Sequence, residues 1–260
     1  MTKLEKLKAD LRGLGELAVA FSGGADSSLL LRAANDALGA RAIGITIRSP
    51  YMSSREIAEA VEFARAYGIR HEILELGVAE EIKNNPENRC YLCKKAVFSR
   101  LIERARELGF SRVADGTNRD DLGEHRPGLK AKEELGVLSP LINLTKSDIR
   151  ELSRELGLPT AAKPSYACLL TRLPHGREID EGELNLIEAA ENLLIASGYA
   201  NVRARCDRKN IKLQMPFTDM QSFLNDAKFK SIVKQLISLG ATDVTLDLKG
   251  LREDVLHERG

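Results

Sequence analysis

Residues suited to binding phosphate gather in the stretch FSGGADSSLL, residues 21–30, directly after the apolar run ELAVA. Glycine permits positive φ and lets a ligand approach the backbone closely, and the free N–H groups at the start of a helix favour an anion. Serine hydroxyls can donate hydrogen bonds to phosphate oxygens, and an aspartate can bind a Mg²⁺ ion that bridges them. The residues predicted to hold a phosphate chain with its magnesium are Ser22, Gly23, Gly24, Asp26 and Ser27.

The spacing of this loop separates it from two common phosphate-binding motifs. No Lys-Ser or Lys-Thr follows the glycines, as it does in a Walker A loop, and the GxGxxG pattern of dinucleotide-binding proteins is absent. The pattern Ser-Gly-Gly-x-Asp-Ser resembles the PP-loop of the ATP pyrophosphatases. That resemblance implies cleavage of ATP between its α and β phosphates, adenylation of a substrate oxygen and release of pyrophosphate. A tight turn that binds no ligand is the alternative interpretation of the loop.

Cysteines form the second group of residues suited to chemistry. Cys90 and Cys93 lie in NRCYLCK, and two thiols at this spacing can bind one metal ion or one edge of an iron–sulfur cluster. Basic side chains surround the pair, and we expect them to favour the reactive thiolate form. Cys168 lies in KPSYACLLTRLPHG, and Cys206 lies in RARCDRK. Zinc bound by all four thiols, or a redox dithiol at the pair, is the alternative to a cluster.

Strands and helices that position these residues alternate through the first part of the chain. Near-continuous runs of Val, Ile and Ala predict buried parallel strands at residues 16–21, 41–47, 70–76 and 111–116. Helical spacing predicts helices at residues 26–38, 53–67, 91–108 and, with Thr145 as N-cap, 145–157. This alternation indicates an α/β fold in which helices cover both faces of a parallel sheet.

A second, smaller domain is expected after the proline-rich stretch LPTAAKPSYACLLTRLPHG. The sequence there predicts a helix at residues 181–197, strands at 201–206, 211–215 and 243–248, and one helix at 220–239. We therefore expect a phosphate-binding α/β domain at residues 1–165 and a C-terminal α+β domain at residues 166–260.

Longer stretches resemble one family from nearly end to end, the LarE family of ATP-dependent sulfur-insertion enzymes. They are NRCYLCK, DGTNRDDLGEHRPGLKAKEELGVLSPL, TKSDIRELSRELGLPTAAKPSYACLLTRLPHG and VTLDLKGLR. The resemblance implies a Rossmann-like PP-loop fold and a role in synthesis of the nickel-pincer nucleotide cofactor. The implied substrate is pyridinium-3,5-biscarboxylic acid mononucleotide, whose carboxylate is adenylated and then converted to a thiocarboxylate. A PP-loop enzyme that thiolates tRNA, or an ATP-binding cluster carrier without activity, is the alternative.

The resemblance also implies how sulfur reaches the substrate. One subgroup of the family sacrifices the cysteine that matches Cys168 and retains dehydroalanine. Another subgroup adds a CxxC pair and holds a [4Fe-4S] cluster on three cysteines, which leaves one iron open for sulfur delivery. Because Cys90 and Cys93 provide that pair here, we expect the cluster version, with Cys168 as the third ligand and Cys206 as a spare thiol.

Further ligands are expected from strand ends and from the C-terminal domain. Arg48 and Asn118 follow predicted strands at the edge where α/β sheets bind ligands, so we expect both at the ATP site. Arg203 and Arg205 alternate on one strand and share a face, where paired guanidiniums suit the phosphate of the mononucleotide. Arg172, four residues after Cys168, is expected to orient an acyl phosphate.

Composition excludes several other classes of protein. Hydrophobic residues make up 43% and charged residues 30%, as in ordinary globular proteins. The net charge of +1 argues against nucleic acid as a partner. Neither a signal peptide nor an apolar run of membrane-spanning length is present, so we expect a cytoplasmic protein with reduced thiols. The family resemblance implies a homo-oligomer, and the sequence identifies no sulfide donor.

Overall fold

The computed structural model describes residues 1–123 and 127–251, and the chain forms two compact units. The first unit contains residues 1–81 and 88–166, and the second contains residues 82–87 together with the chain from Ala167 on. The chain therefore passes between the units at both ends of the segment 82–87 and again after Tyr166. Residues 124–126 of the motif DGTNRDDLGEHRPGLK and the arginine that ends VTLDLKGLR lie outside the described residues.

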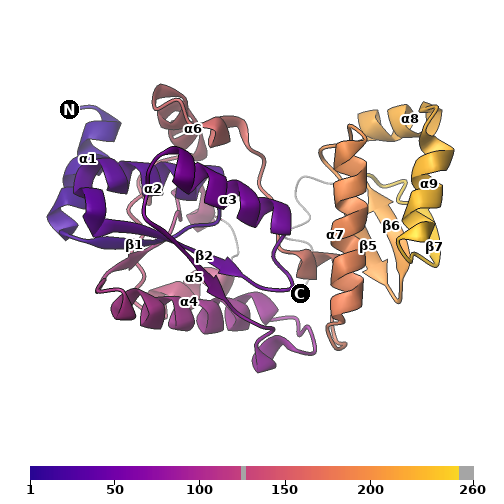
Figure 1. Ribbon diagram of the computed structural model, residues 1–260, viewed down its shortest axis with the longest axis horizontal. Coiled ribbons are helices and arrows are strands. Elements are labelled where there is room, and N and C mark those ends of the chain that lie inside the picture. Colours follow the sequence, from indigo (N-terminus) through magenta and orange to yellow (C-terminus); the bar gives the residue numbers. More distant parts are fainter. Residues whose placement is uncertain (124–126, 252–260) are drawn as a thin grey trace. The chain divides into compact units, whose positions relative to one another are not determined.

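A parallel sheet of four strands forms the centre of the first unit, in the order β3-β2-β1-β4 (Figure 1). Its strands are β1 (Leu17–Ala20), β2 (Ala42–Arg48), β3 (His71–Glu75) and β4 (Val113–Ala114). All three pairings are parallel, with Ala18 opposite Ile43 in β2 and opposite Val113 in β4. Because parallel strands place their carboxyl ends at one edge, the loops after β1, β2 and β4 share that edge. The predicted α/β fold is confirmed.

Helices cover both faces of this sheet (Figure 1). One face is covered by α1 (Lys3–Leu14), α2 (Ala25–Leu38), α3 (Ser54–Ala66) and α6 (Lys146–Glu155), which share a hydrophobic core with Leu17 and Val19 of β1. The other face is covered by α4 (Arg89–Glu107), which packs on Ala18 and on Ile43 and Ile45 of β2. Helix α5 (Pro127–Glu134) packs beside α4. None of the helices in the described part of the chain has the length and apolarity to cross a membrane.

The first residues of α6 agree with the sequence prediction, and those of α4 differ from it. Thr145 caps α6 as predicted: its hydroxyl accepts from the Asp148 N–H, and the Asp148 carboxylate accepts from the Thr145 N–H, which completes a capping box. The sequence predicted that α4 begins at residue 91, just after Cys90. Instead α4 begins at Arg89, so Cys90 and Cys93 both lie on its first turns.

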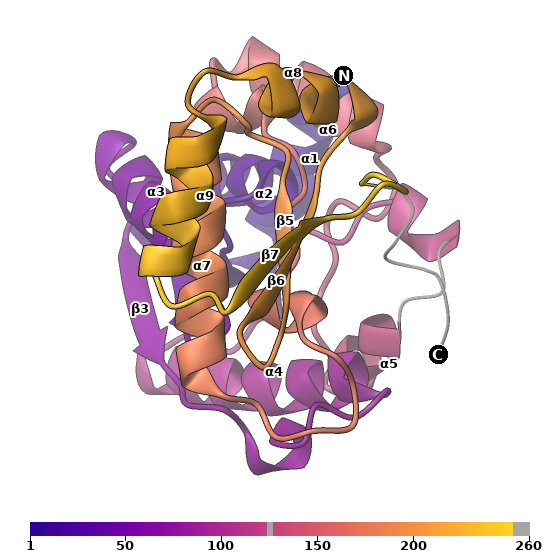
Figure 2. The same ribbon diagram turned by 90° about the vertical axis from the view of Figure 1, so that its right-hand side faces the viewer.

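The second unit contains a three-stranded sheet in the order β5-β6-β7, with helices packed against it (Figure 2). Its strands are β5 (Arg203–Asp207), β6 (Asn210–Gln214) and β7 (Asp243–Leu246). Strand β5 pairs antiparallel with β6, and β6 pairs parallel with β7. The helices are α7 (Glu181–Ala196), α8 (Phe217–Asn225) and α9 (Phe229–Ser238), of which α7 packs on β5 and α9 on β7.

The single helix predicted for residues 220–239 is wrong, because α8 and α9 are separate helices. Asp226 separates them with an extended backbone at ψ 130°. Its carboxylate accepts from the Lys228 N–H at 2.7 Å and from the Tyr199 hydroxyl at 2.8 Å. A short carboxylate that binds the backbone two residues on competes with helical hydrogen bonding, which explains the break.

Candidate active site

The phosphate loop joins β1 to α2 at the carboxyl edge of the first sheet. The hydroxyl oxygens of Ser22 and Ser27 lie 3.1 Å apart, and Ser27 Oγ also accepts from the Ser22 N–H at 3.3 Å. Gly24 is the N-cap of α2 and offers no side-chain cap, so the first N–H groups of the helix have no acceptor from this residue. Asp26 lies half-buried in the first turn. The loop thus combines hydroxyls, helix N–H groups and one carboxylate, as a magnesium–phosphate site needs.

Gly23 has the one backbone conformation in this loop that requires glycine. Its φ is +72°, and a Cβ placed on it would lie 3.0 Å from the Ala60 Cβ of α3. Both the positive φ and the close approach of α3 exclude a larger residue. The sequence pattern predicted that the loop needs glycine here, and the packing of α3 against Gly23 gives the reason.

The loop after β4 packs directly on the start of α2. A Cβ on Gly116 would lie 2.9 Å from the backbone nitrogen of Ser27 and 3.0 Å from the Asp26 Cβ. Two residues later, Asn118 is fully buried and accepts from the N–H groups of Asp120 and Asp121. Sequence position therefore predicted correctly that Asn118 follows a strand at the same edge as the phosphate loop. Its binding of ATP stays a prediction.

Two buried polar atoms at this edge have no hydrogen-bond partner among the described residues: Nδ2 of Asn118, after β4, and Oγ of Ser49, after β2. Asn118 is 0% exposed and Ser49 is 7% exposed. An unpaired buried polar group costs about 1–3 kcal/mol. A polar ligand that pairs with these atoms removes that cost, so the edge fits a nucleotide.

A buried charged network follows β4 and was missed by the sequence interpretation. Asp115 accepts from the Thr117 hydroxyl at 2.7 Å, from the Ser139 hydroxyl at 3.0 Å and from the Lys132 ammonium. Burial opposes the charge of Asp115, but Lys132 and Thr117 more than offset this, so the pKa of Asp115 lies below its ordinary value. The signal in the sequence that could have indicated this network was an aspartate, Asp115, at the end of a predicted strand. Its partner Lys132 lies on α5, which the sequence pattern did not predict.

Arg48 lies at the end of β2, on the predicted edge. Its guanidinium is exposed and pairs with the Glu75 carboxylate of β3 at 2.6 Å. Such exposed pairs contribute little stability, so the guanidinium remains available to a phosphate. Its contact with ATP stays a prediction.

Cys90 and Cys93 share one face of α4, because residues three apart in a helix are neighbours. Cys90 is exposed and Cys93 is half-buried, and Cys93 Sγ donates to the Tyr51 hydroxyl at 3.5 Å. Since Tyr51 follows β2, this contact places the pair at the ligand-binding edge of the sheet. Burial raises the pKa of the Cys93 thiol despite Lys94 and Arg89. The expectation that basic neighbours favour its thiolate is therefore wrong for the protein without a metal.

Cys168 lies at the start of the second unit and is half-buried. Its carbonyl accepts from the Thr171 hydroxyl at 2.9 Å and from Arg172 Nη1 at 3.2 Å. Arg172 is 2% exposed, and its guanidinium pairs with both carboxylate oxygens of Glu191 on α7, at 2.9 and 3.2 Å. The guanidinium is therefore buried and holds the backbone of the Cys168 loop. Its expected role in orienting an acyl phosphate stays a prediction.

Arg203 and Arg205 share the partly exposed face of β5, as their alternation predicted. Ala204 and Cys206, between and after them, are buried. Arg205 Nε donates to the Gln214 side chain of β6 at 2.8 Å, which orients its guanidinium. The two arginines therefore lie on one face of β5, as predicted. That this face binds a phosphate stays a prediction.

Cys206 has an environment unlike that of the other cysteines. It is 1% exposed, and its Sγ donates to the Glu183 carboxylate of α7 at 3.6 Å. Burial, and after it the charge of Glu183, raises the pKa of Cys206 to about 12. The raised pKa keeps this buried thiol protonated at neutral pH. Its expected role as a spare thiol stays a prediction.

No group of three or more His, Cys, Asp or Glu side chains among the described residues is placed to hold a metal ion. Cys90 and Cys93 lie together in the first unit, whereas Cys168 belongs to the second. The convergence of these three sulfurs therefore stays a prediction.

Comparison with known proteins shows relatives along nearly the whole chain. An uncharacterised protein of Synechocystis, slr1717, is 37% identical over 98% of this chain and 97% of its own length. The pyridinium-3,5-bisthiocarboxylic acid mononucleotide synthase of Lactiplantibacillus plantarum is 34% identical over 99% of this chain and 94% of its own length. The tRNA-specific 2-thiouridylase MnmA 1 of Caldanaerobacter subterraneus is 29% identical over 56% of this chain and 52% of its own length. No family model matches the chain.

Proposed function

This chain belongs to the LarE family, and on that premise we propose that it is an ATP-dependent enzyme that inserts sulfur into a pyridinium mononucleotide. The acceptor is a carboxylate of pyridinium-3,5-biscarboxylic acid mononucleotide, and the product is the corresponding thiocarboxylate. The reaction belongs to synthesis of the nickel-pincer nucleotide cofactor. The observation that carries the proposal is the phosphate loop at the start of α2, beside buried polar atoms of Ser49 and Asn118 that have no partner among the described residues.

The first step activates the substrate with ATP. A carboxylate oxygen attacks the α-phosphorus, the bond between that phosphorus and the bridging oxygen breaks, and pyrophosphate leaves with the electron pair. The hydroxyls of Ser22 and Ser27 and the N–H groups at the start of α2 bind the departing phosphates. Asp26 is placed to ligate the Mg²⁺ that offsets the developing charge on them.

The second step replaces AMP with sulfur at the acyl carbon. Cys90 and Cys93 provide two thiols on one face of α4, a donor set that suits an iron–sulfur cluster. We propose Cys168 as the third ligand. A [4Fe-4S] cluster held by these three thiols would deliver sulfide from a separate donor to the acyl carbon, with AMP as the leaving group. Because burial raises the pKa of Cys93, metal binding at this pair has to displace a proton.

All three cysteines lie close to unit boundaries along the chain. Cys90 follows Glu87 by three residues, and Glu87 ends the segment that belongs to the second unit. Cys168 follows Tyr166 by two residues, and Tyr166 ends the first unit. Both cysteine-bearing stretches therefore lie next to points where the chain passes between the units.

A sacrificial route is the alternative use of Cys168. Its sulfur attacks the acyl carbon and AMP leaves; loss of the Cα proton and cleavage of the Cβ–Sγ bond then release the thiocarboxylate and leave dehydroalanine. The two routes differ in the fate of residue 168. Its mass after turnover, measured together with the iron and sulfide content of anaerobically purified protein, distinguishes them.

Pyrophosphate release tests the activation step. Asp26→Asn should reduce release of pyrophosphate with the pyridinium mononucleotide by at least about 100-fold, since the metal ion contributes several kcal/mol to charge stabilisation. Asp36→Asn is the matched control, because Asp36 lies on the same helix and pairs with Lys8 and Arg32 on its outer side. Release of orthophosphate, or release with bulk tRNA instead of the mononucleotide, contradicts the proposal.

Substrate affinity tests the arginine face of β5. Arg203→Ala and Arg205→Ala should each weaken binding of the mononucleotide by about 1.5–3 kcal/mol, as expected for a charge-assisted hydrogen bond to phosphate. The affinity for ATP should not change. Equal loss of both affinities indicates a folding defect and removes these arginines from the substrate site.

A further inference from the structure

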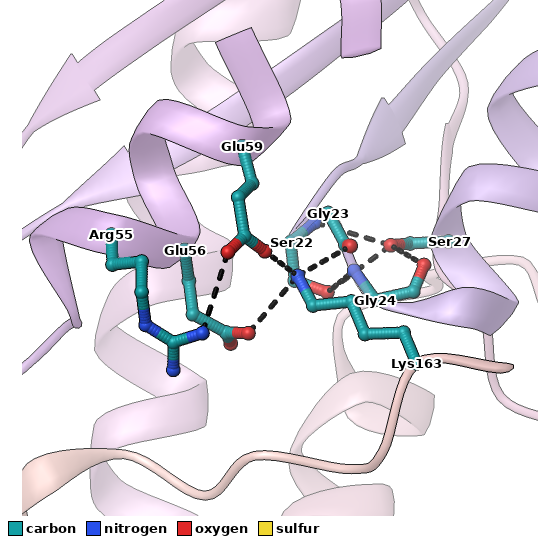
Figure 3. A network of polar contacts seen from close by, with 8 residues as sticks. All are labelled: Ser22, Gly23, Gly24, Ser27, Arg55, Glu56, Glu59 and Lys163. Atoms are coloured by element: carbon teal, nitrogen blue, oxygen red, sulfur yellow. Dashed lines mark hydrogen bonds and ion pairs between the residues drawn. The ribbon is translucent and has the colours of Figure 1, made fainter. Parts of the chain in front are cut away.

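Lys163 connects the proline-rich stretch before Cys168 to the phosphate loop (Figure 3). Its ammonium donates to the Gly23 carbonyl at 3.0 Å and pairs with Glu56 at 3.0 Å and Glu59 at 2.6 Å, both on α3. Only 14% of the Lys163 side chain is exposed. Nothing in the sequence pattern indicated this contact, which joins residues 140 positions apart.

The partners of the Lys163 ammonium indicate that it holds the phosphate loop in place. An ammonium group has three N–H donors, and here three acceptors receive them. Two carboxylates offset its charge, and Arg55 donates to Glu59 at 3.3 Å, so two cations face two anions. A lysine whose charge and donors are taken up in this way is suited to holding a backbone in place. It is poorly suited to binding phosphate directly.

The Gly23 carbonyl determines the direction of a neighbouring N–H group. The carbonyl of one residue and the N–H of the next belong to one planar trans peptide unit and point in opposite directions. Lys163 therefore holds the Gly24 N–H away from itself. Gly24 is the N-cap of α2, so this N–H lies at the helix start. It donates to the Ser22 hydroxyl oxygen of the same loop at 3.4 Å, a long hydrogen bond that a phosphate oxygen can replace. Without the lysine, glycine on both sides of the peptide lets it rotate and present a carbonyl, which repels an anion.

We propose that Lys163 is a positioning residue for the ATP-dependent step, acting through the peptide between Gly23 and Gly24. The inference rests on the proposed function, in that the loop binds the phosphates of ATP. The same lysine anchors the stretch that leads to Cys168, and Tyr166 is held on α3 as well, with the Arg55 guanidinium 5.5 Å from its ring centroid. Lys163 thus fixes both the phosphate loop and the last residues of the first unit before Cys168.

Three variants of the full chain test the proposal. Lys163→Met removes the ammonium and keeps a similar length, and Lys163→Arg keeps the charge and a donor for the carbonyl. Lys8→Met is the matched control, because Lys8 makes a partly buried ion pair with Asp36 away from the loop. Calorimetry gives the Kd for Mg-ATP, steady-state kinetics give KM and kcat for pyrophosphate release, and thermal unfolding gives Tm.

We expect Lys163→Met to raise the Kd and the KM for Mg-ATP by roughly tenfold to a hundredfold, the equivalent of one charge-assisted hydrogen bond. The KM for the pyridinium mononucleotide should stay unchanged. Lys163→Arg should recover most of the affinity, and Lys8→Met should match the wild type. A Lys163→Met protein with a lower Tm but wild-type Kd and KM has lost only stability, and that result overturns the proposal.

Failure of the proposed function has a different signature. Wild-type protein that binds Mg-ATP but releases no pyrophosphate with the mononucleotide contradicts the assigned substrate. In that case the Kd of the Lys163→Met variant still tests the positioning role, because it requires only ATP. Wild-type protein that does not bind Mg-ATP overturns both.

Discussion

The buried pair of Arg172 and Glu191 allows a sharp test of how the Cys168 loop is held. Each side chain is 1% exposed, and the two groups meet through two hydrogen bonds, at 2.9 and 3.2 Å. Glu191 also accepts from the Ala204 N–H of β5 at 2.9 Å. Arg172→Met removes the cation and leaves the buried Glu191 carboxylate without its guanidinium partner.

The expected cost follows from the burial of both groups. Breaking a buried ion pair by removing one partner costs about 3–5 kcal/mol, because the other charge remains uncompensated. Arg172→Met and Glu191→Met should each reach this range. The double variant leaves no buried charge. The Cys168 carbonyl and the Thr171 hydroxyl also lose Arg172 but keep their mutual hydrogen bond. The Ala167 carbonyl and the Ala204 N–H each lose a partner, at about 1 kcal/mol each. We therefore expect the double variant to cost about 2 kcal/mol, less than either single variant.

Urea unfolding followed by circular dichroism measures these free energies. Arg104→Met is the control, because Arg104 makes a partly exposed pair with Glu72 in the first unit, and its loss should cost about 1 kcal/mol or less. Since Arg172 Nη1 donates to the Cys168 carbonyl, Arg172→Met should also speed alkylation of Cys168 in folded protein. If the double variant costs as much as the sum of the two singles, the charges do not interact and the argument is refuted.

Two further predictions concern the first unit. Gly116→Ala places a Cβ within 3.0 Å of the backbone at the start of α2, so it should cost about 1–3 kcal/mol by overpacking and raise the KM for ATP; a wild-type KM contradicts the packing of the β4 loop on the phosphate loop. Asp148 has its pKa lowered to about 2 by hydrogen bonds from Lys3 and Thr145. Because its folded pKa lies below the unfolded value, its stabilisation is present above about pH 4 and is lost as the pH falls toward 2. Asp148→Asn should therefore be less stable than wild type at pH 7, by about 1 kcal/mol or less, and the difference in urea unfolding free energy should vanish near pH 2; a constant difference contradicts the assignment.

Local patterns predicted the parts of this structure that local physics determines. The glycine–serine loop between an apolar run and a helix, and the capping box at Thr145, depend on residues within a few positions of one another. Alternation placed Arg203 and Arg205 on one face of β5 for the same reason, since the period of a strand is two residues. Fold class followed from the repeated order of strands and helices.

Three features of the site depend on contacts between residues far apart in the sequence, and the sequence patterns did not predict them. Arg172 was expected to face substrate, but Glu191, 19 positions away, takes its guanidinium into the interior. Lys132 was overlooked because its partner Asp115 lies at the end of another element. Basic neighbours of Cys93 suggested a thiolate, yet burial beside Tyr51 outweighs them. Burial decides the case of Cys93, and buried ion pairs decide the cases of Arg172 and Asp115. All three depend on tertiary packing, which has no local signature in the sequence.

Two cations bracket Cys168 along the chain, the half-buried Lys163 and the buried Arg172. Lys163, five residues before it, is bonded to the phosphate loop of the first unit, and Arg172, four residues after it, is bonded to α7 of the second. Each cation also holds backbone carbonyls, of Gly23 in one case and of Ala167 and Cys168 in the other. In the proposed reaction an acyl-adenylate forms where ATP binds, and sulfur has to reach the same carbon. The stretch that carries Cys168 is therefore held on both sides, by Lys163 before it and by Arg172 after it.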